Sequence, residues 1–258
     1  MNKFSFLVFS ILVFICFGCG QDEKKENKYI GESPVFKVSK TEETMIVDGK
    51  MDEAIWSKTE VKSFDNIYQN LKPNDYQKSF FRMLWDDKNL YVFFEFEDKY
   101  LTVRETKRDG APFFDDCAEI FIIPVPEQLN THFGFELNLN KASNDFVYFN
   151  KYYNNTNIAL KTFNPEFEAE VTFNGTINDN TDIDKGWTME MKIPLSVFGF
   201  LGEFVPVKAG NKWTFLGLRQ DRNDAEGDRR STSTLFPIAD FSKNVHEPTD
   251  FGLMEFVD

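Results

Sequence analysis

Three carboxylates lie close together in the sequence, at Asp115, Asp116 and Glu119. Such a group can accept hydrogen bonds from sugar hydroxyls or hold a cation, and a pair of carboxyls about 5–9 Å apart can hydrolyse a glycosidic bond. In a strand, Asp115 and Glu119 would share one face and Asp116 would lie on the other, so the spacing permits a pair. A solvated strand edge, with Glu119 hydrogen-bonded at its rim, explains the same carboxylates without catalysis.

Two phenylalanines, Phe113 and Phe114, stand directly before these carboxylates. They follow the connection Gly110-Ala111-Pro112, where no strand alternation requires a large apolar side chain to be buried. Contact with a ligand is therefore one interpretation of this pair, and local packing is the other.

His132 and His246 are the only histidines of the chain, and no Cys-x-x-Cys-His motif occurs, which excludes covalent haem attachment. Non-covalent haem binding through a methionine and a histidine stays open, with Met83 or Met189 as the methionine. Both methionines occupy inward positions of alternating segments, where core packing is the better interpretation. The sequence also lacks a Gly-rich phosphate loop, a zinc-spaced His/Cys set and a nucleophile elbow.

Alternation of apolar and polar residues dominates the chain after residue 33, and helical periodicity is scarce. Brief helices are expected only at 52–56 and 195–198. Many short strands separated by turn signals predict an all-β fold, an antiparallel β-sandwich with one or two short helices. No repeat or change in composition divides residues 34–258, so we interpret them as one domain. The predicted strands lie at 80–85, 90–97, 118–123, 133–140, 167–173, 189–193, 213–217 and 253–257.

The first 18 residues have the order of parts of a secretory signal. Lys3 precedes an apolar run over 4–17 that is too short for a comfortable membrane span, and Gly18 stands before Cys19. A cysteine in this place resembles the bacterial lipoprotein signal, in which Cys19 would be lipidated and become the mature N-terminus. Cys16 occupies a position where such signals usually carry leucine. An ordinary cleaved signal peptide and an uncleaved anchor are the alternatives.

Residues 19–33 contain almost nothing that can be buried, which predicts a flexible tether that reaches roughly 20 Å. The acidic residues just after Cys19 resemble the surface-export signals of Bacteroidetes-type lipoproteins. We therefore expect an exported protein that is lipid-anchored to the outer membrane or cell surface. Each buried methylene contributes about 0.8 kcal/mol to such an anchor.

The net charge limits the classes of partner, and the number of cysteines limits the possible disulfides. The chain has 29 Lys and Arg against 42 Asp and Glu, a net charge of −13. Such a surface disfavours nucleic acid and anionic lipid and suits neutral ligands or cations. Of the 3 cysteines, Cys16 leaves with the signal and Cys19 carries lipid, so Cys117 has no partner for an internal disulfide.

An ordered series of segments resembles the family 9 carbohydrate-binding modules and the broader family 9-like domains of secreted bacterial proteins. The resemblance implies a jelly-roll-like sandwich, binding of a sugar or of a polysaccharide end, frequent bound calcium, and no catalysis by the module itself. It therefore argues against a hydrolytic role for Asp115 and Glu119. The segments that carry it are 46–56 (IVDGKMDEAIW), 84–92 (LWDDKNLYV) with Asp98, 115–122 (DDCAEIFI), 186–194 (GWTMEMKIP) and 248–252 (PTDFG).

The resemblance also implies positions for binding residues. Family members clamp a sugar between two tryptophans; the first falls at Phe113, with Phe114 beside it, and the second falls near Val245, where no aromatic residue stands. His246 is next to that position. Polar partners of the sugar hydroxyls fall at Glu119, at Arg219 and at Glu136, where the family has a basic residue. Calcium, through Asp48, Asp52 or Asp98, rests on the resemblance alone.

The sequence thus predicts a non-catalytic, carbohydrate-binding lipoprotein that supports carbohydrate uptake or breakdown, with a polysaccharide-degrading enzyme as a partner. One alternative is a haem-binding sandwich module for electron transfer. The other is a scaffold protein of the cell envelope that has lost sugar binding. The absence of a second aromatic clamp residue suggests this alternative.

Overall fold

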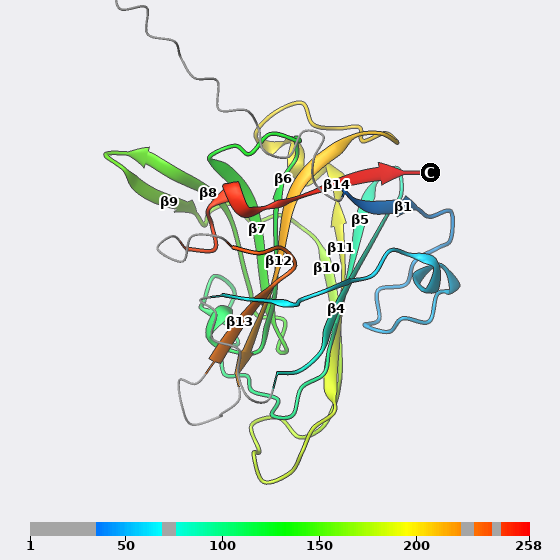
Figure 1. Ribbon diagram of the computed structural model, residues 1–258, viewed down its shortest axis with the longest axis vertical. Helices are drawn as coiled ribbons and strands as arrows, with labels where there is room; N and C mark the ends of the chain where they lie inside the picture. The colour runs from blue at the N-terminus through cyan, green and yellow to red at the C-terminus, as the bar shows by residue number, and fades with distance from the viewer. Residues whose placement is uncertain (1–34, 69–75, 223–229, 239–243) are drawn as a thin grey trace, which may run out of the picture.

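A computed structural model describes residues 35–68, 76–222, 230–238 and 244–258 (Figure 1). The predicted signal and the whole predicted tether, including Cys19, lie outside the described residues. The strands are β1 Val35–Lys40, β2 Lys62–Ser63, β3 Asn66–Ile67, β4 Ser79–Trp85, β5 Asn89–Phe96, β6 Cys117–Ile123, β7 Thr131–Asn138, β8 Ser143–Tyr153, β9 Thr156–Leu160, β10 Glu168–Asn174, β11 Gly186–Pro194, β12 Lys212–Arg222, β13 Arg230–Thr234 and β14 Gly252–Val257.

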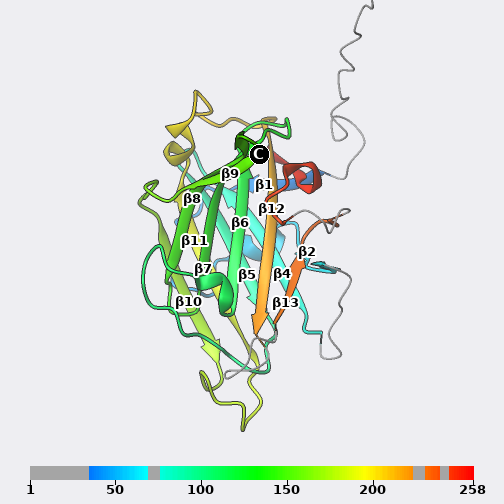
Figure 2. The same cartoon turned by 90° about the vertical axis from the view of Figure 1, so that its left-hand side faces the viewer.

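The 14 strands form one continuous sheet that folds over itself into two facing layers (Figure 2). The first layer has the order β10-β11-β5-β4, and the second has the order β12-β6-β7-β8-β9 with β13 beside β12. β1 and β14 join the two layers. The predicted all-β sandwich is confirmed, although β1 pairs in parallel with both β14 and β4, which the antiparallel prediction did not include.

The core fills the space between the layers, because alternate residues of each strand point into it. Phenylalanine rings meet there at tilted angles, as Phe81 and Phe94 do with centroids 5.3 Å apart. Burying one such side chain contributes about 1.5–3 kcal/mol. The inward residues include Phe81, Met83, Val92, Phe94, Ile120, Phe133, Phe135, Met189, Met191 and Phe215.

Part of the outer face of the first layer is covered by the chain that precedes β2. Trp56 packs on Phe93 with ring centroids 5.4 Å apart. Glu190 of β11 accepts hydrogen bonds from the backbone N–H groups of Asp48 (3.0 Å) and Gly49 (3.2 Å). Gly49 has a φ of +78°, a backbone conformation that favours glycine. These contacts fix residues 46–56, the first of the segments that carry the family resemblance.

The helices of the described residues are short 3-10 turns. η1 Ala54–Lys58 and η4 Leu195–Phe200 confirm the two predicted helical segments, while η3 Pro112–Phe114 and η5 Pro248–Asp250 were not predicted. Each of the unpredicted turns begins at a proline, whose fixed φ suits the first position of a helix. No helix within the described ranges is long and apolar enough to cross a membrane.

The buried carboxyl of Glu190 should make stability depend on pH. Burial raises its pKa to about 7, from an ordinary value of 4.5 that also applies to the unfolded chain. The folded state therefore holds this proton more tightly, so its contribution is complete below pH 4.5 and is lost as the pH rises through 7. We expect Glu190→Gln to remove on the order of 1 kcal/mol of the stability difference between pH 5.5 and pH 8, measured by urea denaturation.

Glu97→Gln, which removes an exposed carboxylate of the same layer, is the control and should keep the wild-type pH dependence. An identical pH dependence in Glu190→Gln and the wild type would contradict this role of Glu190.

Candidate functional site

A row of polar side chains crosses the outer face of the second layer. Directly opposite residues of antiparallel strands share a face, and Glu119 of β6 lies opposite Glu136 of β7, which lies opposite Asn144 of β8. Gln220 of β12 donates to Glu119 at 2.8 Å, and Thr232 of β13 donates to Gln220 at 2.6 Å. Asn144 donates to Glu136 at 2.7 Å. We call Thr232, Gln220, Glu119, Glu136 and Asn144 the polar row.

The polar row is buried and rich in hydrogen-bond acceptors. Glu119 is 1% exposed and Glu136 is 4% exposed. Burial raises the pKa of Glu136 well above its usual range, the neighbouring Glu119 raises it further, and the hydrogen bond from Asn144 opposes both. Asn144 Oδ1 is buried without a hydrogen-bond partner. Carboxyl and amide oxygens in this arrangement suit a ligand that donates hydrogen bonds.

The aromatic pair Phe113 and Phe114 lies in η3, which contacts β6, β7 and β12. Phe114 is 51% exposed and Phe113 is half-buried, with ring centroids 4.7 Å apart. Asp115, which ends η3, accepts hydrogen bonds of 2.8 Å from the Glu105 backbone and from the Asn138 side chain. Asp115 thus fixes the turn that carries the two rings against the second layer.

An aromatic cluster occupies the rest of this outer face. His246 stacks on Tyr148 with centroids 4.2 Å apart and on Phe121 at 4.7 Å. His246 Nδ1 and His132 Nε2 are 3.1 Å apart, a hydrogen bond that requires one N–H donor. Burial lowers the pKa of His246 to about 4 and lowers that of His132 well below its usual range, so both rings are neutral near pH 7. His246, rather than the adjacent Val245, brings a ring to the region where the resemblance implies the second clamp residue.

Arg219 lies on the opposite side of β12 from the polar row. It pairs in register with Ala118, a core residue, whereas Leu218 pairs with Glu119. Arg219 and Glu119, which the sequence analysis expected to bind sugar hydroxyls together, therefore do not share a face of the layer. The residue of β12 that reaches Glu119 is Gln220, which the sequence analysis missed, along with Asn144 and Thr232.

Arg219 instead forms a buried ion cluster at one end of the core. It is 1% exposed, and its Nη2 lies 3.0 Å from Asp98 Oδ2 and 3.5 Å from Asp221 Oδ2. Its Nη1 donates to Ser79 Oγ at 2.6 Å, and its guanidinium lies over the Phe96 ring. The cluster joins the end of β5 to the end of β12.

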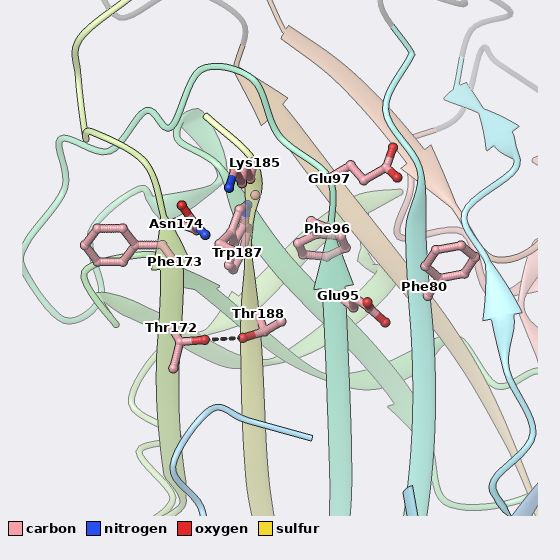
Figure 3. Close-up of a pocket in the computed structure, with 11 residues that line it drawn as sticks. Phe80, Glu95, Phe96, Glu97, Thr172, Phe173, Asn174, Lys185, Trp187 and Thr188 are labelled. Atoms are coloured by element: carbon pink, nitrogen blue, oxygen red, sulfur yellow. Dashed lines mark hydrogen bonds between the residues drawn. The ribbon is translucent and has the colours of Figure 1, made fainter. Parts of the chain in front are cut away.

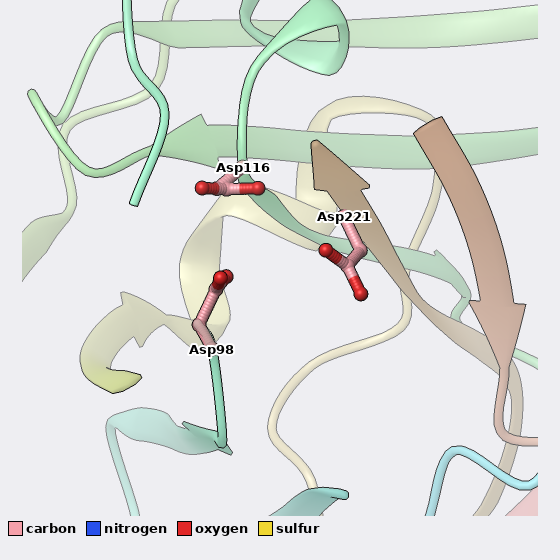
Figure 4. Close-up of side chains that lie close together, drawn as sticks. All are labelled: Asp98, Asp116 and Asp221. Carbon is pink, nitrogen blue, oxygen red and sulfur yellow. The ribbon is translucent and has the colours of Figure 1, made fainter. Parts of the chain in front are cut away.

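Asp98, Asp116 and Asp221 are, within the described part of the chain, the one group of three His, Cys, Asp or Glu side chains close enough to share a metal ion (Figure 4). Burial raises the pKa of Asp98 to about 6, against the opposing effect of Arg219. Calcium requires six to eight oxygen ligands. Both Asp116 oxygens already accept 2.6 Å bonds from the backbone of Thr102 and Arg222.

Arg219 already pairs with Asp98 and Asp221, and both Asp116 oxygens accept backbone hydrogen bonds, so this group does not fit a calcium ion. The other two residues that the resemblance suggested as calcium ligands lie elsewhere. Asp48 binds the side chain of Lys50 at 2.9 Å, and Asp52 is exposed. Neither belongs to the three-aspartate group.

Comparison with known proteins decides the family. Residues 47–258 match the family model described as "Carbohydrate family 9 binding domain-like". The chain belongs to this family. Binding modules of carbohydrate family 9 are non-catalytic, as the sequence resemblance implied. A search of curated proteins finds no match.

Solved structures share the fold. A family 9 carbohydrate-binding module from Caldicellulosiruptor kristjanssonii, in complex with cellotriose, is similar with a TM-score of 0.59 and 20% identity, covering 87% of this chain and 94% of the module. A Bacteroides uniformis protein is similar with a TM-score of 0.62 and 16% identity, covering 86% and 98%. At these identities the likeness shows the fold alone.

The methionines considered for haem lie in the core of this family 9 domain. Met83 and Met189 are both 0% exposed and pack among the inward side chains of the two layers. His132 is equally buried and is hydrogen-bonded to His246. These side chains therefore do not line a common surface that a planar cofactor could reach.

The Arg219 cluster predicts a large loss of stability on substitution. Arg219→Met removes the positive charge and leaves buried carboxylates uncompensated, so we expect a loss of about 3–5 kcal/mol in the free energy of unfolding, measured by chemical denaturation. Arg82→Met is the control, because Arg82 pairs with the partly exposed Glu95 at 3.0 Å and should lose only about 1 kcal/mol or less. Equal losses in the two variants would contradict the account of the cluster.

Proposed function

We propose that the outer face of the second layer binds a sugar or the end of a polysaccharide. The observation that carries the proposal is the polar row. Along β6, Glu119 of this row lies between the start of the strand, which follows Phe113 and Phe114 of η3, and Phe121, which stacks on His246. Family membership supports carbohydrate as the ligand class, since the domain matches the family over residues 47–258. The related module from Caldicellulosiruptor kristjanssonii binds cellotriose and, in another structure, glucose.

Each part of the face has a separate task in this proposal. The Phe113 and Phe114 rings offer an apolar platform for the C–H face of a sugar ring. Glu119 accepts hydrogen bonds from hydroxyl groups, and Gln220 holds the Glu119 carboxylate in place. Glu136 and the free acceptor Asn144 Oδ1 extend the same set of acceptors. His246 supplies a ring in the region where family members carry a second clamp residue.

We also propose that the protein is exported and anchored by lipid on Cys19 to the outer membrane or cell surface. There it would present the sugar for uptake, or for breakdown by a polysaccharide-degrading enzyme. The order of charged, apolar and small residues over 1–18, and the acidic tether that follows, support this placement.

Substitution of the aromatic platform should weaken sugar binding. Removing one ring from a sugar contact costs on the order of 1 kcal/mol, so Phe113→Ala should lower the affinity for the best oligosaccharide of a glycan panel about fivefold or more, measured by calorimetric titration. Phe200→Ala, which removes a 56% exposed ring from η4, is the matched control and should bind as the wild type does. A broad panel without any binding would reject the proposal and favour the envelope scaffold.

Substitution of the lipidated cysteine should release the protein. Without Cys19 no acyl chains can be attached, so Cys19→Ala should move the protein from the membrane fraction to the soluble fraction of the producing cell, measured by fractionation and immunoblotting. Cys117→Ala, which alters the buried cysteine of β6, should remain membrane-bound. A Cys19→Ala protein that stays in the membrane fraction would reject the lipid anchor.

A further inference from the structure

The outer face of the first layer carries a hollow of its own, on the opposite side of the sandwich from the polar row. It has a volume of about 440 Å³ and lies over β10, β11, β5 and β4 (Figure 3). Four of its side chains are directly opposite one another in register: Thr172 faces Thr188, Thr188 faces Glu95, and Glu95 faces Phe80. Neighbouring strands are about 4.8 Å apart, so these side chains form one row across four strands.

The polar groups of the hollow are held in fixed directions. Thr188 Oγ1 donates to the carbonyl oxygen of Gly49 at 2.6 Å and lies 2.7 Å from Thr172 Oγ1. Because the Thr188 proton is used within the protein, the two hydroxyl oxygens offer lone pairs as acceptors. Glu95 is oriented by Arg82 at 3.0 Å. These groups are ready to accept hydrogen bonds without rearranging.

Exposed polar side chains stand at the rim of the hollow. Trp187 contributes to its floor, but the ring of Trp187 packs in the core on Phe96, with centroids 4.6 Å apart. Asn174 and Lys185, which also line the hollow, add exposed donors at this rim.

One apolar ring, Phe80 on β4, lies beside this group of residues (Figure 3). Phe173 on β10 is 49% exposed, but it pairs in register with the core residue Trp187 and its ring points away from Thr172 and Thr188. Carboxylates and an ammonium group occur together, so the hollow has no strong preference for a charged ligand. Fixed acceptors, exposed donors and an apolar ring together match a neutral, polyhydroxylated ligand.

We propose that this hollow is a second saccharide-binding site, for neutral oligosaccharides. It goes beyond the proposed function, because it shares no residue with the polar row and lies on the other layer. Two sites on opposite faces of one anchored domain would let it contact two polysaccharide chains together. Simultaneous binding at both sites strengthens the overall attachment, although the affinity of each single site is unchanged.

Backbone amide shifts of the full, isotopically labelled chain provide the test, with cellotriose, xylotriose and mannotriose as probes. The proposal predicts that at least one trisaccharide shifts the amides of Thr172, Asn174 and Thr188. Phe80→Ala and Asn174→Ala should each weaken these shifts about fivefold or more, while shifts near Phe113 stay unchanged. Asn174 is exposed and Phe80 is partly exposed, so the fold should be retained. Phe200→Ala is the matched control and should change neither set.

The outcomes separate the two proposals. Shifts confined to the region of Phe113 and Glu119 overturn the second site and support the proposed function. Shifts at 172–188 without shifts near Phe113 support the second site and contradict the proposed function. Shifts at 172–188 that survive both substitutions overturn the second site, and no shift with any of the three probes overturns both.

Discussion

The alternation of side chains along strands that face one another across a core decides what each residue of this domain can do. In β6 and β7 the core takes Ile120 and Phe135, which leaves Glu119 and Glu136 on the outer face. A shift of one position in the register of a strand would move each outward side chain into the interior. Both proposed binding surfaces exist because the same apolar core holds two layers apart, with a row of polar side chains on the outer face of each.

The ion cluster at the end of the core shows how the fold accommodates charge in its interior. Three aspartates from different parts of the chain meet there, and Arg219 provides the opposite charge. The bonds from the Thr102 and Arg222 backbone to Asp116 tie the loop after β5 and the end of β12 to the start of β6. The turn that carries Phe113 and Phe114 immediately precedes this anchor. Charge compensation in the interior therefore supports the position of the aromatic platform outside.

Much of the fold could be predicted from the sequence, because alternation and turn residues are local signals. The alternation of Trp213, Phe215 and Gly217 also predicts that Arg219 points inward, whereas the family resemblance places it among the binding residues. The pairing of Glu136 with Asn144, and of Gln220 with Glu119, depends on the register between strands that are distant in sequence. Residue spacing does not determine that register, so these parts of the site required the structure. The meeting of Arg219 with Asp98 depends on the same kind of long-range pairing.

The polar row and the aromatic turn beside it are the centre of the account. A crystal structure of the chain with a bound oligosaccharide tests it most directly, with the tightest ligand of the glycan panel or otherwise cellotriose. The account predicts a sugar ring against Phe113 or Phe114, with a hydroxyl group hydrogen-bonded to Glu119 and with Arg219 still in contact with Asp98. A sugar held through Arg219, or bound away from both the polar row and the Phe113 turn, would contradict it.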